Sequence, residues 1–205
     1  MNSDRIAVLL FSILYATSAL WVYWVCKFSV YVAGCWGQKK SIGSFMDLLR
    51  AQGIAVTHDW TTYEETYGDG ATLETVRQKF VQGVSSPQDQ SRYGTYANFD
   101  LDGVREADLV VMIMDQPEYE YRGTFTELGA ALSLGKPVIM TGPSTVRAAT
   151  NVFYWHSGIE QRVADTEEAL RLVLQQKHEW DKNQLCRVCL GVLMVAASTI
   201  SLWRE

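Results

Sequence analysis

A short, almost uninterrupted apolar run in the middle of the chain constrains the fold most. Residues 108–114 read Asp-Leu-Val-Val-Met-Ile-Met, so one charged residue is followed only by hydrophobic ones. A strand that is hydrophobic at every position, rather than at alternate positions, is typical of a sheet covered on both faces. Such sheets consist of parallel strands, which need long and usually helical crossovers. The run therefore predicts a layered α/β domain.

The segments around this run alternate between the two periodicities that such a fold requires. Strands are expected where short runs of β-branched and apolar residues lie between polar loops, and helices where apolar residues recur every three or four positions. This alternation predicts a five-stranded, parallel, doubly wound sheet of the flavodoxin-like or Rossmann-like kind. The expected strands are Phe28–Ala33, Ile54–Thr57, Asp108–Met114, Pro137–Met140 and Val152–Trp155; the expected helices are Ser41–Ala51, Leu73–Val84, Thr124–Leu134 and Thr166–Gln176.

Two longer apolar segments flank the alternating region. Residues 6–26 carry no charge and are long enough, as a helix, to cross a hydrocarbon core of roughly 30 Å. Residues 188–203 form a shorter run, which reaches a spanning length if Leu185 and Cys186 are included and Arg187 snorkels. The fold class is thus an α/β sheet domain flanked by terminal hydrophobic helices.

The apolar ends divide the chain into three expected parts. We predict a membrane anchor at residues 1–27, the α/β domain at 28–180, and a second hydrophobic helix, a candidate span, at 181–205. Two alternatives stay open: the first run is a cleaved signal peptide, or either run is a buried or interfacial helix of a soluble oligomer. If both cross a membrane, the lysines beside their inner ends place the α/β domain in the cytoplasm.

Charge and composition limit the classes of ligand and cofactor that the chain is expected to bind. The formal net charge is -5 and no basic stripe is evident, so a small molecule is expected rather than a nucleic acid. The four cysteines lack the spacing of a secreted disulfide scaffold, which favours a reducing compartment. Neither clustered metal ligands nor a dinucleotide or phosphate-binding glycine motif is found, so we expect no metal and no cofactor.

The predicted topology locates the binding site. In sheets of this kind, ligands bind beyond the carboxyl ends of strands, where the strand order reverses, and here that point lies between the first and third strands. The first strand ends at Gly34, and the loop after the third strand leads into Gly123 and Thr124 at a helix start. Glycine allows a ligand to approach the backbone, and a helix N-terminus favours an anion. We therefore expect Gly34, Gly123 and Thr124 to contact the ligand.

Glu127 has two interpretations. Thr124 and Glu127 have the spacing of a capping box, in which the glutamate returns to the backbone at the helix start. The same glutamate lies at the base of the expected crevice, where it can act as a nucleophile if a second carboxylate serves the leaving group. The available partners, of which Asp108 suits a structural role and Asp115 a loop cap, are Asp100, Asp102, Asp108 and Asp115.

Several motifs occur in an order and spacing that point to a known family. They are Val30-Tyr31-Val32-Ala33-Gly34, then Asp100-Leu101-Asp102 ahead of Ala107–Val111, then Gly123–Ala131 followed by Leu134–Val138, and finally Asn151–Tyr154. In this arrangement the segment from about Phe28 to Leu174 resembles the nucleoside 2-deoxyribosyltransferases and the related 2′-deoxynucleoside 5′-phosphate N-hydrolases.

The resemblance implies roles for individual residues. Glu127 matches the nucleophile that attacks C1′ of the sugar, Asp100 the carboxylate that assists the leaving base, and Tyr31 the tyrosine that hydrogen-bonds around them. The sugar then passes to a second base or to water. The resemblance also implies a substrate contact from Asn151 and a homo-oligomer, a dimer, because relatives share residues across the active site.

One departure from the family pattern affects the substrate. Transferases of the family often carry an aspartate two residues before the Gly-Thr pair, where this chain has Tyr121. The next residue, Arg122, either binds a 5′-phosphate or is a solvated loop charge. Trp60 either stacks on a base or packs in the core. The alternative to an enzyme is a non-catalytic, membrane-associated nucleotide-binding sensor or effector.

Overall fold

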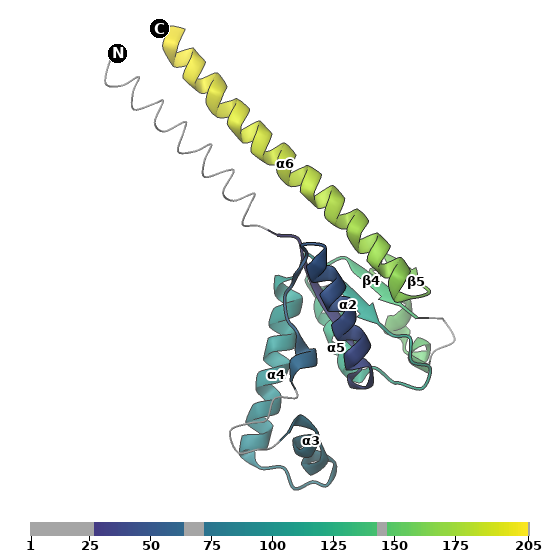
Figure 1. The fold of residues 1–205 in the computed structure, drawn as a ribbon. Helices are drawn as coiled ribbons and strands as arrows, with labels where there is room; N and C mark the ends of the chain where they lie inside the picture. Colours follow the sequence, from purple (N-terminus) through teal and green to yellow (C-terminus); the bar gives the residue numbers. More distant parts are fainter. Residues whose placement is uncertain (1–26, 64–71, 143–146, 205) are drawn as a thin grey trace. The chain divides into compact units, whose positions relative to one another are not determined.

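The computed structural model describes residues 27–63, 72–142 and 147–204 (Figure 1). The chain divides into two compact units. One comprises Ser29–Val173, contains every strand, and is called the sheet unit below; the other comprises Met1–Phe28 together with Leu174–Glu205. The apolar run at residues 6–26, predicted as an anchor, lies outside the described residues, and the division at residues 1–27, 28–180 and 181–205 stays a prediction.

The sheet unit is built on five parallel strands in the order β2-β1-β3-β4-β5. This order confirms the predicted flavodoxin-like topology, with its reversal between β1 and β3. Strand β3 is buried at every position, and β1 is buried except at its two end residues, because helices cover both faces of the sheet. The strands are β1 (Ser29–Gly34), β2 (Ala55–Val56), β3 (Leu109–Ile113), β4 (Val138–Thr141) and β5 (Gln161–Val163).

The helices follow from the same topology. Parallel crossovers are right-handed, so the change of direction at β1 places α2 on one face of the sheet and α4 and α5 on the other. On that second face, α4 and α5 pack against each other and against β1. The helices are α2 (Lys39–Ala51), α3 (Leu73–Val81), α4 (Pro87–Glu106), α5 (Arg122–Ser133) and α6 (Thr166–Arg204).

The prediction of a strand at Val152–Trp155 is wrong. This segment is a 3-10 helix, η4, because the side-chain oxygen of Asn151 accepts a hydrogen bond from the Phe153 amide and turns the chain. The apolar side chains of Val152, Phe153 and Trp155 are largely exposed rather than buried in a sheet. The fifth strand is β5 at the sheet edge, where Gln161 and Arg162 gave no apolar signal.

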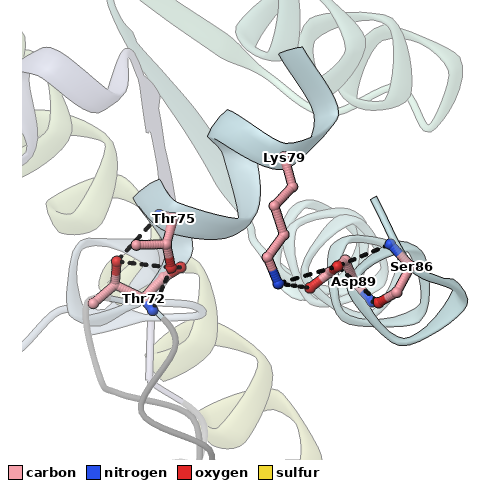
Figure 2. A network of polar contacts seen from close by, with 5 residues as sticks. All are labelled: Thr72, Thr75, Lys79, Ser86 and Asp89. Atoms are coloured by element: carbon pink, nitrogen blue, oxygen red, sulfur yellow. Dashed lines mark hydrogen bonds and ion pairs between the residues drawn. The ribbon is translucent and has the colours of Figure 1, made fainter. Parts of the chain in front are cut away.

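Helices α3 and α4 both start at capping boxes, which Figure 2 shows. At α4, Ser86 accepts from the Asp89 amide and Asp89 accepts from the Ser86 amide, with Pro87 at the first helical position. At α3, Thr72 and Thr75 exchange the same pair of bonds. The Ser86–Asp89 box fixes where α4 begins, and hence which of its residues face the sheet.

Helix α6 is much longer than the predicted Thr166–Gln176 and continues to Arg204. In the second unit its surface carries helical ion pairs, such as Lys177 with Asp181 at 2.5 Å. Within the ranges that the structure describes, no helix is both long enough and apolar enough to cross a membrane. The predicted C-terminal span therefore finds no support.

Close packing at Gly103 sets the position of α4 against β1. A Cβ atom at Gly103 would lie 2.7 Å from Cβ of His58 and 2.8 Å from the ring of Tyr31. Thr57 adds a hydrogen bond of 2.8 Å from its hydroxyl to the Gly103 carbonyl. The absence of a side chain thus lets the last turns of α4 approach the centre of the sheet.

Substitution of Gly103 by alanine tests this packing. We expect Gly103→Ala to lower the free energy of unfolding by about 1–3 kcal/mol, because the new methyl group overpacks against Tyr31 and His58. Gly94→Ala is the matched control in the same helix, since nothing lies within 4 Å of its added Cβ. It should raise stability by up to about 1 kcal/mol through helix propensity. Equal effects of the two variants in urea unfolding would contradict the proposed packing.

Candidate active site

A cleft of about 360 Å³ lies where the topology predicts a site, at the carboxyl end of β1. Its floor includes Gly34 from β1 and Gly123 and Thr124 from the start of α5. Two carboxylates line it, Asp100 from α4 and Glu127 from α5. The remaining lining is mainly aromatic and comes from Trp36, Trp60, Tyr63, Tyr93 and Tyr96.

Glu127 is held by the first strand rather than by its own helix. The hydroxyl of Tyr31, a fully buried residue of β1, donates a hydrogen bond of 2.6 Å to Oε1 of Glu127. Such a short bond to a carboxylate is strong and fixes its orientation. One carboxylate oxygen is thereby held in place while the side chain lines the cleft.

The capping-box interpretation of Glu127 is not what the structure adopts. Helix α5 begins at Arg122, with Tyr121 as its N-cap residue in the left-handed region at φ 51°. Thr124 is therefore already the third helical residue, and its hydroxyl donates to the carbonyl of Gly34 over 3.1 Å. Glu127 lies in the second turn, too far along the helix to return to the cap. The spacing was right for a capping box, but the N-cap is Tyr121, three residues before Thr124.

Asp100 approaches the cleft from α4 and belongs to a small polar cluster. The hydroxyl of Tyr63 donates to Oδ1 of Asp100 over 3.4 Å, and Nε2 of His58 hydrogen-bonds to the same hydroxyl. Because Tyr63 uses its proton toward Asp100, the His58 ring must be the donor in the second bond, which requires the tautomer with hydrogen on Nε2. Burial lowers the pKa of His58, so this ring is mainly neutral near pH 7.

Burial alters the proton affinity of both carboxylates. It raises the pKa of Glu127 to about 8, with a further rise from the nearby charge of Asp100 and an opposing effect of the Tyr31 hydrogen bond. It raises the pKa of Asp100 to about 6, opposed by the nearby hydroxyl groups of Tyr31 and Tyr63. Burial likewise raises the pKa of Tyr31 far above its usual value, so this hydroxyl stays a donor. Two carboxyl groups with displaced pKa values in one cleft are typical of acid–base chemistry.

Aromatic side chains form the walls of the cleft. Trp60 is buried, and its indole N–H donates to the Val32 carbonyl over 2.7 Å, at a level of β1 beyond the two-residue β2. Trp36 lies 6.3 Å from Trp60, centroid to centroid, and Tyr63 lies 4.1 Å from Tyr96. Trp60 therefore packs in the core and also lines the cleft, and its stacking on a base stays a prediction. These flat surfaces suit a planar ring such as a nucleobase.

Of the other residues predicted to contact the ligand, some line the cleft and others do not. Gly34, Gly123 and Thr124 line the cleft as expected. Arg122 does not line it: its side chain is 87% exposed and pairs with Glu120 at 2.6 Å. Asn151 is not among the cleft residues either, because its side chain is used to cap η4. In this chain, Asn151 contributes to the local turn rather than to the cleft.

The family departure at Tyr121 has a structural explanation. Tyr121 is buried, and its hydroxyl donates to Oε1 of Gln38 over 3.0 Å while accepting from the amide of Gln116 over 2.8 Å. Gln38 in turn accepts from the thiol of Cys35. The tyrosine thus ties the loop before α5 to the segment after β1, and it fixes the early start of the helix.

Sequence reasoning missed most of the contribution of α4. Tyr93, Tyr96 and Asp100 are spaced three and four residues apart, so they share one helix face. That spacing is a visible signal, but the helix lacks an apolar stripe and was not predicted in full. Arg77 of α3 was also missed, although it lines the cleft; nothing in its neighbourhood of the sequence marks it.

Comparison with known proteins agrees with this location. A family model described as nucleoside 2-deoxyribosyltransferase matches residues 30–171. The match covers more than half of the 205 residues, begins within β1 and ends in α6. It therefore includes every residue named above as lining the cleft. A comparison with curated proteins found no match.

The raised pKa of Glu127 predicts a pH-dependent cost to stability. The folded chain binds this proton more tightly than the unfolded chain, so stability falls as pH rises from about 4.5 to about 8. Glu127→Gln removes that cost, and we expect its midpoint of thermal unfolding to exceed that of the wild type by a few degrees at pH 8.5. The gain should be small at pH 5, as followed by circular dichroism. The exposed control Glu118→Gln should show no such difference between the two pH values.

Proposed function

The chain belongs to the nucleoside 2-deoxyribosyltransferase family, and we propose that it breaks the N-glycosidic bond of a nucleoside or nucleoside 5′-monophosphate with Glu127 as nucleophile. The family indicates an enzyme that acts on nucleosides, as a transferase or as an N-glycosidase. Three residues have a role in the proposed reaction. Glu127 attacks C1′, Asp100 donates a proton to the leaving base, and Tyr31 positions Glu127.

The proposed reaction has two displacements. The ionised carboxylate of Glu127 attacks C1′, the C1′–N bond breaks, and its electron pair leaves with the base nitrogen. Asp100 donates a proton to the base, which leaves as a neutral molecule. A second base or a water molecule then attacks C1′ and gives up a proton to Asp100. The ester bond breaks and Glu127 is released as a carboxylate.

The observation that carries the proposal is the bond from Tyr31 to Glu127. It directs a carboxylate into a cleft that Asp100 shares, although burying two groups of like charge is unfavourable. A cleft that only binds a neutral nucleoside gains nothing from that arrangement, whereas a covalent mechanism needs both groups. This favours an enzyme over a non-catalytic sensor or effector.

Transfer and hydrolysis differ only in the second step. The aromatic walls suit an incoming base as well as a leaving one, because stacking does not depend on the direction of reaction. Tyr121, which stands where transferases often have an aspartate, is committed to Gln38 and Gln116. Loss of that aspartate leaves fewer polar contacts to a second base, and we propose water as the usual acceptor.

Base release is the direct test. The protein is incubated with a panel of deoxynucleosides and their 5′-monophosphates, with and without an acceptor base, and free base is followed by chromatography. Glu127→Gln should lower release by about 10³-fold or more, as removal of a covalent nucleophile typically does. The exposed loop variant Glu118→Gln should retain the wild-type rate. Absence of release from every substrate would refute the proposed activity.

The paired carboxylates predict the pH dependence of the reaction. Catalysis needs one proton on the pair: with two protons Glu127 is no nucleophile, and with none Asp100 is no acid. The pKa values are about 6 for Asp100 and about 8 for Glu127, so between them the single proton is mainly on Glu127, and the reactive form, with the proton on Asp100, is the minor one. The fraction of that form changes little between the two pKa values, so kcat/KM should be bell-shaped, falling below pH 6 and above pH 8. A profile that keeps rising to pH 9.5 would argue against a proton donor in the pair.

A further inference from the structure

A second hollow of about 710 Å³ continues the cleft on the side away from the carboxylates. The two share six lining residues, among them Trp36, Arg77 and Tyr93, so they form one continuous groove. Asp100 and Glu127 are not among the residues that line the outer hollow. Its basic lining residues are Arg77, which also lines the cleft, and Arg122. The charge of the groove thus changes sign along its length.

The charge balance of the outer hollow favours an anion. Glu120, its acidic lining residue, already pairs with Arg122 at 2.6 Å and with Arg147 at 2.7 Å. Two guanidinium groups therefore share one carboxylate, which leaves a positive excess at this end of the groove. Arg122 lines only the outer hollow, whereas Arg77, an exposed residue, lines both the cleft and the outer hollow.

Helix α3, which carries Arg77, is fastened to α4 at a defined point, seen in Figure 2. Nζ of Lys79 lies 3.2 Å from Oδ1 of Asp89, a buried residue that also accepts from the amide and hydroxyl of Ser86. The rings of Phe80 and Tyr93 add a contact at 4.6 Å between centroids. We call the Lys79–Asp89 pair and the Phe80–Tyr93 contact the α3 latch.

The Lys79–Asp89 ion pair of the α3 latch persists at neutral pH, where the enzyme would act. The amide and hydroxyl of Ser86, followed by Lys79, lower the pKa of Asp89 to about 2, so the carboxylate stays charged at neutral pH. Arg77 lies two residues before Lys79 on the same short helix. Fixing Lys79 therefore fixes the base of the Arg77 side chain at the rim of the groove.

We propose that Arg77 is a specificity-determining residue that binds the 5′-phosphate of a nucleoside 5′-monophosphate, and that the α3 latch positions it. The inference rests on the proposed function, which places C1′ beside Glu127. C5′ is attached to C4′, on the other side of the ring oxygen from C1′. Its phosphate is repelled by the carboxylates and is directed toward the outer hollow. A planar guanidinium can bind two phosphate oxygens at once.

The test compares two substrates that differ only in the phosphate. We expect wild-type kcat/KM to be higher for a deoxynucleoside 5′-monophosphate than for the matching deoxynucleoside. Arg77→Gln should lower the value for the monophosphate by about 10- to 100-fold, as loss of a charge-assisted contact typically does, and lower the nucleoside value far less. Arg77→Lys should restore part of the preference. Arg105→Gln, which removes an arginine paired with Asp102 outside the groove, should change neither value.

The positioning role of the α3 latch is tested by the kinetics of Lys79 variants. Lys79→Gln should raise KM for the monophosphate and leave kcat and the nucleoside reaction unchanged, and Lys79→Arg should restore KM. A general loss of folding would instead lower both reactions together. Equal effects of Arg77→Gln on the two substrates, or none on either, would overturn the proposal.

Binding separates this inference from the proposed function. If neither substrate releases base, the proposed activity fails, and calorimetry with the same monophosphate and nucleoside still tests Arg77. The expected result is tighter binding of the monophosphate to the wild type, lost in Arg77→Gln. Equal affinities of both ligands for the wild type would refute a phosphate site at Arg77.

Discussion

The hydrogen bond from Tyr31 to Glu127 joins the first strand to the helix that follows the third strand, and the geometry of the cleft depends on it. Both partners need their own support. Tyr31 is fully buried within β1, and α5 is held at its start by the hydrogen bonds of Thr124 to Gly34 and of Tyr121 to Gln38. A carboxylate oriented by a strand keeps its direction better than one on a free loop, because strand and helix are fixed by the core.

This arrangement is unfavourable for the folded state and has to be offset elsewhere. Two carboxyl groups are partly withdrawn from water and raise each other's free energy when charged. The compensation comes from the sheet beneath them, where β1, β3 and β4 are buried almost without polar side chains. In a parallel sheet the apolar strands form a stable layer, and the site lies at their carboxyl ends. The stability of that layer can offset the cost of placing two carboxyl groups there.

The sequence allowed the parts governed by strong patterns to be predicted. The apolar run at residues 108–114 led to the parallel sheet, and topology led to the end of β1. The site residues Tyr31, Asp100 and Glu127 came from the family resemblance, since capping explained the Thr-x-x-Glu spacing equally well. The failures have physical causes. At η4, the cap formed by Asn151 overrode an apolar run, and β5 is a short edge strand without an apolar signal. Helix α4 is set by Ser86 and by the close packing of Gly103, neither of which is a periodic signal.

The distribution of contacts separates the proposed chemistry from the proposed recognition. Tyr31, Asp100 and Glu127 are positioned by β1, α4 and α5, which pack on one another in the core of the sheet unit. Arg77 is on α3, which is joined to the first turns of α4 by the ion pair of Lys79 with the buried Asp89 and by the Phe80–Tyr93 contact. A change at an exposed position of α3 such as Arg77 therefore leaves the sheet intact, whereas a change at Tyr31 disturbs the sheet itself. A fold organised this way can change which substituent on the sugar it accepts without moving the carboxylates that act on C1′.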